Sequence, residues 1–231
     1  MFLCTPELAN VTFGIQRTYR PVGLFFEMMT DPSPPDPKET LHRYLRVQRD
    51  HLLAKLDRLG ERDVRRPLTP TGTNLLGVVK HVASVQLGYF GEVFDRPPGR
   101  LLPWLDEDAE TNADMWATAD ETRDEILDLH RFSAAHSDAT IEALDLESPG
   151  LVPWWPPRRR HVTLHQILVH VTVETARHAG HADVVRELVD GVAGNNDGNL
   201  PDLTETEWAN YRARLEAAAE EADRRSAKRS S

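Results

Sequence analysis

The chain has 231 residues, of which 40% are hydrophobic and 28% are charged, so it can bury a core and is long enough for one large domain or two small ones. Its formal net charge of −10 argues against nucleic-acid binding, which needs a basic face. Cys4 is the only cysteine, so no intramolecular disulfide can form, and no apolar run approaches the roughly 20 residues of a membrane span. We therefore expect a cytoplasmic protein that binds neither nucleic acid nor a membrane.

Residues 1–38 differ from the rest of the chain. They mix apolar residues without a clear period and end in a stretch, Thr30 to Pro37, that holds four prolines. Proline interrupts helices and central strands because it fixes φ and has no backbone N–H. We expect an N-terminal extension over 1–38 that is extended or disordered.

Two amphipathic helices are predicted next, over residues 39–59 and 75–94. Leucines recur at helical spacing in the first helix, which Gly60 is expected to close. Thr73 or Asn74 can cap the second helix. The segment between the helices is rich in proline, glycine and threonine, so we expect a loop there.

Two further helices are predicted over residues 120–144 and 163–189. The second of these is mostly apolar, and Gly191 follows its end. The segment 148–160 between them contains four prolines, so it is expected to be a loop. Side chains of this loop could line the entrance of a site, namely Trp154, Trp155 and Arg158–Arg160.

A last helix is predicted from the capping box Thr204–Glu207 to about Arg224, with a frayed polar tail after it. No segment shows the clean alternation of a strand, and there is no internal repeat. Four long amphipathic helices joined by loops of mixed length predict an all-α bundle over 39–191. A C-terminal turn, helix and polar tail would follow over 192–231.

Ionisable side chains gather on one face of the fourth helix. His170, Glu174 and His178 are each four residues apart, and His181 follows three residues later. Residues at these spacings share a helix face. If that face points into the bundle, each group needs a partner, because an unpaired buried charge is very costly. A divalent cation would satisfy several of these groups at once.

A metal site needs a further ligand from another helix, since such sites generally use at least three protein ligands. His81 is the natural donor, because it is a lone imidazole in the most apolar part of the second helix. With Glu174 and His178 it would supply two nitrogens and one carboxylate, which suits zinc, iron, nickel or manganese. Two plainer interpretations stay open: His81 as a hydrogen-bonded core histidine, and Glu174 with His178 as a surface ion pair near Arg177.

Two stretches, LLGVVKHVASVQLGYF and ETARHAGHADVVREL, resemble the DinB-like metal-dependent four-helix-bundle superfamily, and the second is most similar to its mycothiol-dependent, maleylpyruvate isomerase-like branch. The resemblance covers roughly 39–191 and implies a DinB-like four-helix bundle with an additional C-terminal helix. It also implies His81, Glu174 and His178 as metal ligands. His181 falls where many members have glutamine, so the resemblance implies that it supports the ligands or binds water.

The resemblance implies an activity as well: a metal, zinc in the first place, that binds a low-molecular-weight thiol such as mycothiol or bacillithiol. The thiol would be transferred to a small electrophilic substrate or used to isomerise it. Trp154, Trp155 and Arg158 are the candidate contacts for these small molecules, although the tryptophans could equally latch the loop to the surface. His181 is the best candidate for a general base, and His51 is a distant second.

Two other functions stay open at this point. One is a non-catalytic bundle that binds a metal or ligand in a stress response, in which case His170 or His181 could close the metal site as a fourth ligand. The other is a metal-dependent hydrolase, which would use the same ligands. Helical bundles are commonly dimeric, so a homodimer is compatible with any of the three.

Overall fold

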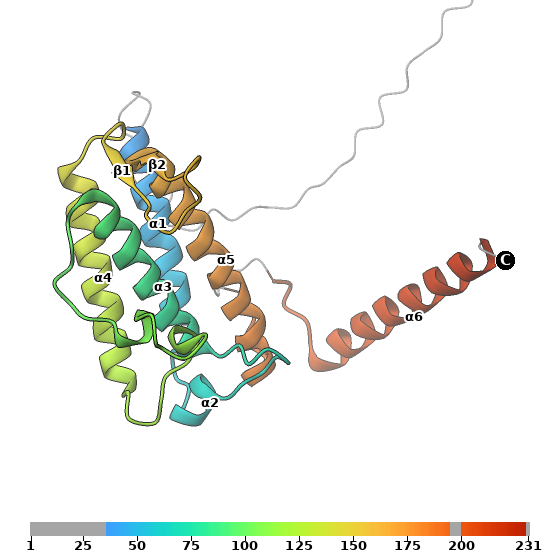
Figure 1. Cartoon of the computed structure of the whole chain (residues 1–231). Coiled ribbons are helices and arrows are strands. Elements are labelled where there is room, and N and C mark those ends of the chain that lie inside the picture. The colour runs from blue at the N-terminus through green and yellow to red at the C-terminus, as the bar shows by residue number, and fades with distance from the viewer. Residues whose placement is uncertain (1–35, 195–199, 230–231) are drawn as a thin grey trace, which may run out of the picture. The chain divides into compact units, whose positions relative to one another are not determined.

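The computed structural model describes residues 36–194 and 200–229, and the regular secondary structure within these ranges is almost all helix (Figure 1). The predicted N-terminal extension 1–38 lies outside the described residues except for its last three. The α-helices run as α1 Pro37–Ala54, α2 Glu61–Arg65, α3 Leu75–Phe90, α4 Arg123–Ala143, α5 Leu164–Asp190 and α6 Glu205–Arg229. Short 3-10 helices occupy Glu92–Phe94, Pro103–Leu105 and Ala113–Met115.

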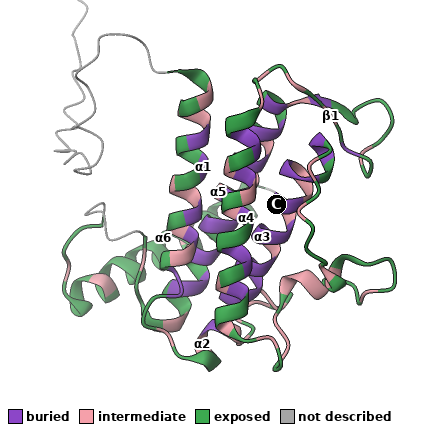
Figure 2. Ribbon diagram, turned by 90° about the vertical axis from the view of Figure 1, so that its left-hand side faces the viewer, coloured by how far each residue is buried: buried purple, intermediate pink, exposed green. Residues whose placement is uncertain are grey.

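The four long helices α1, α3, α4 and α5 form a bundle in which α5 packs on both α1 and α3, and α3 also packs on α4. Their buried faces point toward one another, as the purple sides of the ribbons in Figure 2 show. The DinB-like all-α bundle predicted from the sequence is thus confirmed. No helix among the described residues is long and apolar enough to cross a membrane.

Several helix ends lie where local capping chemistry predicts them. The Asn74 side chain accepts a 2.8 Å hydrogen bond from the Gly77 N–H at the start of α3, and Thr163 caps α5. Gly191 ends α5 in the left-handed conformation, with φ of 77°. The capping box of α6 is formed by Thr204 and Glu207, as predicted.

The predicted end of the first helix is wrong by five residues, because α1 stops at Ala54. Arginines from other helices bind the carbonyl groups that follow: Arg186 donates to Lys55 and Asp57 at 2.8 and 2.9 Å, and Arg123 donates to Leu59 at 2.8 Å. These contacts stabilise a turn in place of a further helical turn. Gly60 therefore does not close α1 but precedes α2, which the sequence analysis missed.

Two other boundaries differ from the prediction. Helix α3 ends at Phe90 rather than residue 94, because the chain turns at Gly91 and continues as a 3-10 helix. A Cβ at Gly91 would lie 2.3 Å from the Leu87 carbonyl oxygen, so a larger residue would not fit this turn. Helix α6 continues to Arg229 instead of fraying after Arg224, and none of its residues is buried.

The structure also contains a small hairpin that the sequence analysis missed. Strand β1 Pro149–Leu151 lies in the segment 148–160 predicted as a loop, and β2 His161–Thr163 directly follows that segment. The two strands form an antiparallel hairpin with Gly150 opposite Val162. Three-residue strands are too short to show a period. The hairpin packs tightly on the bundle, since a Cβ at Gly150 would lie 2.8 Å from the Phe94 ring.

A buried polar network closes the bundle between α1 and α4. Asp138 accepts hydrogen bonds from Arg49 at 2.5 Å and from His42 at 2.7 Å, and Arg49 also donates to Gln86 on α3. His130 lies nearby on α4, 3% exposed, and its Nε2 has no hydrogen-bond partner among the described residues. Burial, reinforced by the charge of Arg49, lowers the pKa of His130 to about 4.

This histidine makes the unfolding free energy depend on pH. Between the ordinary pKa of 6.5 and about 4, the unfolded chain binds a proton at His130 that the folded chain does not. The free energy of unfolding therefore has its full value above pH 6.5 and decreases as the pH falls below it. We expect His130 to contribute about 2 kcal/mol of the loss between pH 7.5 and 5. Denaturant unfolding in the presence of a chelator should show a shallower loss for His130→Gln, and equal losses in the two proteins would contradict this role.

Candidate metal centre

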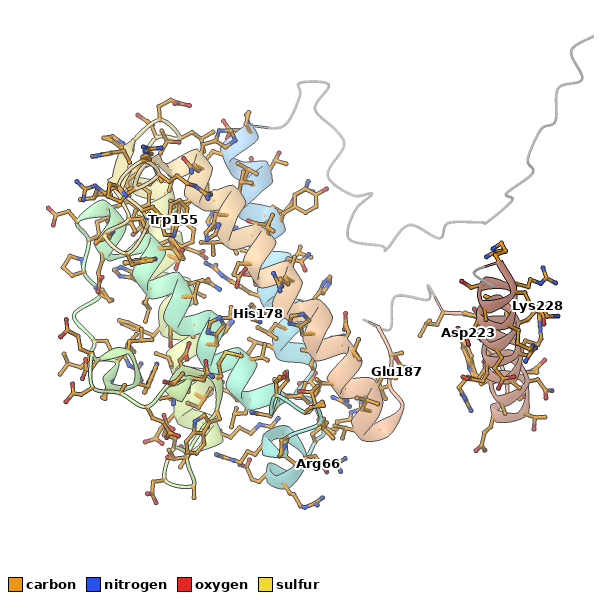
Figure 3. The ribbon with its side chains drawn as sticks, turned by 45° about the vertical axis from the view of Figure 1, so that its right-hand side comes forward. Arg66, Trp155, His178, Glu187, Asp223 and Lys228 are labelled. Carbon is orange, nitrogen blue, oxygen red and sulfur yellow. The ribbon has the colours of Figure 1, made fainter. Side chains whose placement is uncertain are left out.

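Helices α3 and α5 bring three of the predicted residues together. His81 comes from the middle of α3, and Glu174 and His178 come from successive turns of α5. One ligand atom from each of the three lies within 4.8 Å of the other two. Figure 3 shows His178 between the two helices, with Trp155 further along α5 toward the hairpin. His81 is also hydrogen-bonded, and Glu174 and His178 form an ion pair, as the two plainer interpretations expect.

The three side chains have the chemistry and much of the geometry of a metal site. Glu174 Oε1 and His178 Nε2 are 3.0 Å apart, and the rings of His81 and His178 are 4.6 Å apart, edge to face. Ligand atoms on one tetrahedral ion are about 3.4 Å apart. Small side-chain rotations would therefore bring the three ligand atoms to the spacing of a metal site. Two imidazole nitrogens and one carboxylate oxygen are ligands that zinc and its neighbours accept.

His178 is suited to binding a cation. Burial, and secondarily the proximity of His81, lowers the pKa of its imidazole, which keeps the ring neutral. Its Nδ1 is buried and has no hydrogen-bond partner among the residues that the structure describes. A buried polar atom without a partner is costly, so this ring has a binding capacity that the protein alone does not use.

Asp114 is a part of the centre that the sequence analysis missed. Its Oδ2 lies 2.6 Å from Nδ1 of His81, and this hydrogen bond holds the pKa of Asp114 below its ordinary value. An ionised carboxylate only accepts, so Nδ1 of His81 carries the proton and Nε2 is left with its lone pair free. A carboxylate behind a histidine is the usual arrangement that orients a metal ligand.

The backbone that carries Asp114 is held against α3 at close range. A Cβ at Gly77 would lie 1.8 Å from the Met115 carbonyl oxygen, so only glycine permits this approach. The Asn74 side chain donates to that same oxygen at 3.2 Å. Lys80, 2% exposed, donates to the carbonyls of Ala113 and Trp116 at 3.0 Å each. These contacts fix the segment 113–116, and with it the position of Asp114 beside His81.

Neither of the other two histidines of α5 joins the group of three. His181 is exposed, and its ring lies 5.6 Å from that of His178. His170 packs against Tyr89 and Trp155, with ring distances of 4.9 and 5.1 Å. Within the described ranges, the group that could hold a metal therefore has three members and no fourth protein donor.

The predicted small-molecule contacts lie on the hairpin, two helical turns along α3 from His81. Trp155 is partly buried in the core, and its Nε1 donates to the Tyr89 hydroxyl at 3.0 Å. Trp154 is 50% exposed and stands edge-on to Tyr89 at 5.3 Å. Arg158 is exposed. Trp155 thus packs on the core, while Trp154 and Arg158 are open to solvent.

The sequence matches a known protein family. Residues 40–191 match the family described as mycothiol-S-transferase. A crystal structure described as a conserved protein from Enterococcus faecalis is similar to 69% of this chain and 100% of its own, with 17% identity and a TM-score of 0.50, a likeness of fold alone. No curated protein matches the sequence.

Removal of Asp114 should weaken metal binding without unfolding the protein, since the segment 113–116 keeps its other contacts. For Asp114→Ala we expect a loss of zinc affinity of about 10- to 100-fold, measured by competition with a chromophoric chelator. Asp114→Asn should lose less, because the amide oxygen can still accept from Nδ1. Asp108→Ala, an exposed carboxylate in the same acidic stretch, is the matched control. Wild-type affinity in Asp114→Ala would show that His81 does not depend on it.

Proposed function

The chain belongs to the mycothiol S-transferase family, and on this premise we propose that it is a divalent-metal-dependent enzyme that uses mycothiol for S-transfer to, or isomerisation of, a small electrophile. The observation that carries the proposal is the convergence of His81, Glu174 and His178 without a fourth protein donor among the described residues. A structural zinc site is closed by four protein ligands, whereas a catalytic site has three and keeps a position for substrate.

The metal would be held by His81, Glu174 and His178, with Asp114 orienting the first of them. Zinc suits this donor set, and nickel, iron and manganese are alternatives. A divalent ion there would stabilise the thiolate form of a coordinated thiol at neutral pH. Glu174 would lower the net charge of the ion and its ligands from +2 to +1, which favours exchange of an anionic sulfur.

The proposed S-transfer reaction balances without any change of oxidation state. The thiol gives up its proton, the sulfur forms a bond to the electrophilic carbon, and the leaving group departs with the electron pair of the broken bond. We assign His181 as the acceptor of the thiol proton, because its ring is exposed to solvent and lies 5.6 Å from that of His178. Its solvent contact would let the proton leave the site.

Contacts to the small molecules would come from the hairpin. Trp154 offers an open aromatic face, Trp155 supports it through the shared hydroxyl of Tyr89, and Arg158 can reach an anionic group. Each of these residues is attached to the bundle by the short strands β1 and β2. The hairpin would thus position the two tryptophans next to the face formed by α3 and α5.

Variants of the three candidate ligands test the proposal. His178→Ala should lose metal retention, and Glu174→Ala should weaken it by about ten-fold or more, since one of three ligands is gone. Glu174→His should keep the metal, because imidazole also ligates, but change mycothiol affinity or turnover. Metal content is measured by elemental analysis, thiol affinity by calorimetry, and turnover as loss of mycothiol with a small alkylating electrophile.

His165→Ala and Glu187→Ala are matched controls, since both residues are exposed on the same helix α5 and stand apart from the candidate site. Both should retain metal and activity. If Glu174→Ala holds metal as tightly as wild type, Glu174 is not a ligand. If wild type binds metal and mycothiol but consumes no thiol with any electrophile, the protein is a binding bundle rather than an enzyme.

A further inference from the structure

A cavity of about 840 Å³ opens beside α3, within the size range of small-molecule sites. It is lined by Ser84, Val85 and Gly88 of α3, by Glu92 of the 3-10 helix that follows, and by residues of the segment 97–106. Trp154 of the hairpin also lines it. None of the three candidate metal ligands is among the lining residues.

The cavity adjoins the metal centre along one helix face. His81, Val85 and Gly88 follow at intervals of four and three residues, so they lie on the same side of α3. Val85 is one helical turn, about 6 Å along the axis, beyond His81. A molecule lying in the cavity can therefore extend its reactive end toward the position that His81, Glu174 and His178 surround.

The walls favour an apolar ligand. Leu101, Leu105 and Trp154 border the cavity and are 90%, 52% and 50% exposed, so a ligand would cover apolar surface that now faces water. The hydroxyl groups of the walls are already engaged, and the charged side chains of Glu92, Arg100 and Asp106 lie at exposed positions of the lining. Ser84 Oγ donates to the Lys80 carbonyl at 2.8 Å and accepts from Trp104 Nε1 at 2.9 Å, and the Tyr89 hydroxyl accepts from both hairpin tryptophans.

These features favour the electrophile over the thiol. A hydroxyl-rich thiol would leave polar groups unpaired against the apolar part of the lining, which is costly. We propose that the cavity binds the apolar, preferably aromatic, body of the electrophilic substrate, and that Gly88 and Trp154 determine its size. The inference rests on the proposed function, because it assumes that an electrophile is brought to the metal centre.

Gly88 is the residue that keeps the cavity open. A Cβ there would lie 3.5 Å from Cη2 of Trp154, an ordinary contact, so alanine fits and a branched side chain would occupy the ligand's place. Both replacements favour the helical state over glycine. Gly88→Ala and Gly88→Leu thus form a graded pair that alters cavity volume while leaving His81, Glu174 and His178 in place.

The first measurement is binding of the unreactive 1,3-dinitrobenzene to the full-length, metal-free protein by calorimetry. Wild type and Gly88→Ala should bind it saturably, and Gly88→Leu should bind about ten-fold more weakly. Trp154→Ala should also weaken binding, whereas Trp208→Ala on α6 is the matched control that should not. No binding by wild type, or equal binding by Gly88→Leu, would overturn the assignment.

The second measurement uses the metal-loaded protein with mycothiol. For Gly88→Leu, KM for 1-chloro-2,4-dinitrobenzene should rise about ten-fold, while KM for the small iodoacetamide and the Kd of mycothiol stay unchanged. An equal rise for both electrophiles would contradict a size-selective cavity. If no thiol is transferred by wild type but dinitrobenzene binding still responds to Gly88→Leu, the proposed reaction fails and the cavity assignment stands.

Discussion

The packing of α3 against α5 is the interaction on which the candidate site depends. It brings the imidazoles of His81 and His178 to a ring distance of 4.6 Å, in surroundings where burial keeps His178 neutral. Two imidazoles approach in this way without repulsion only if they are not both positively charged, and a carboxylate four residues before His178 balances a cation placed between them. The same contact leaves a buried nitrogen without a partner, which is an unusual cost for a structural core.

A single face of α3 organises the chemistry along the helix. Toward its N-terminus, Gly77 admits the backbone of Met115 and so places Asp114 behind His81. Toward its C-terminus, the same side of the helix becomes the floor of the cavity. The buried Lys80 belongs to this arrangement, because its hydrogen bonds hold the segment that carries Asp114. The position of thiol activation and the cavity for the electrophile would thus lie one helical turn apart along α3.

Local signals in the sequence were sufficient for the helices and for placing Glu174 and His178 on one face, because helical spacing and caps such as Asn74 act over a few residues. The meeting of His81 with this pair joins helices far apart in the chain, and the family resemblance, not a local signal, implied it. Asp114 could not be found in this way. It lies 33 residues from His81 in an irregular segment, and only the close approach at Gly77 joins them. The end of α1 and the hairpin were missed for a similar reason, since arginines from distant helices and contacts with Phe94 decide them.

The central claim is that a thiol sulfur binds a metal held by His81, Glu174 and His178. The most direct test is the absorption spectrum of the cobalt-substituted protein during titration with mycothiol. The account predicts one cobalt per chain and a thiolate-to-cobalt charge-transfer band that grows with mycothiol and does not form with its S-methyl derivative. Cobalt binding with no band upon addition of mycothiol, or a band that persists when His81 is replaced by alanine, would contradict it.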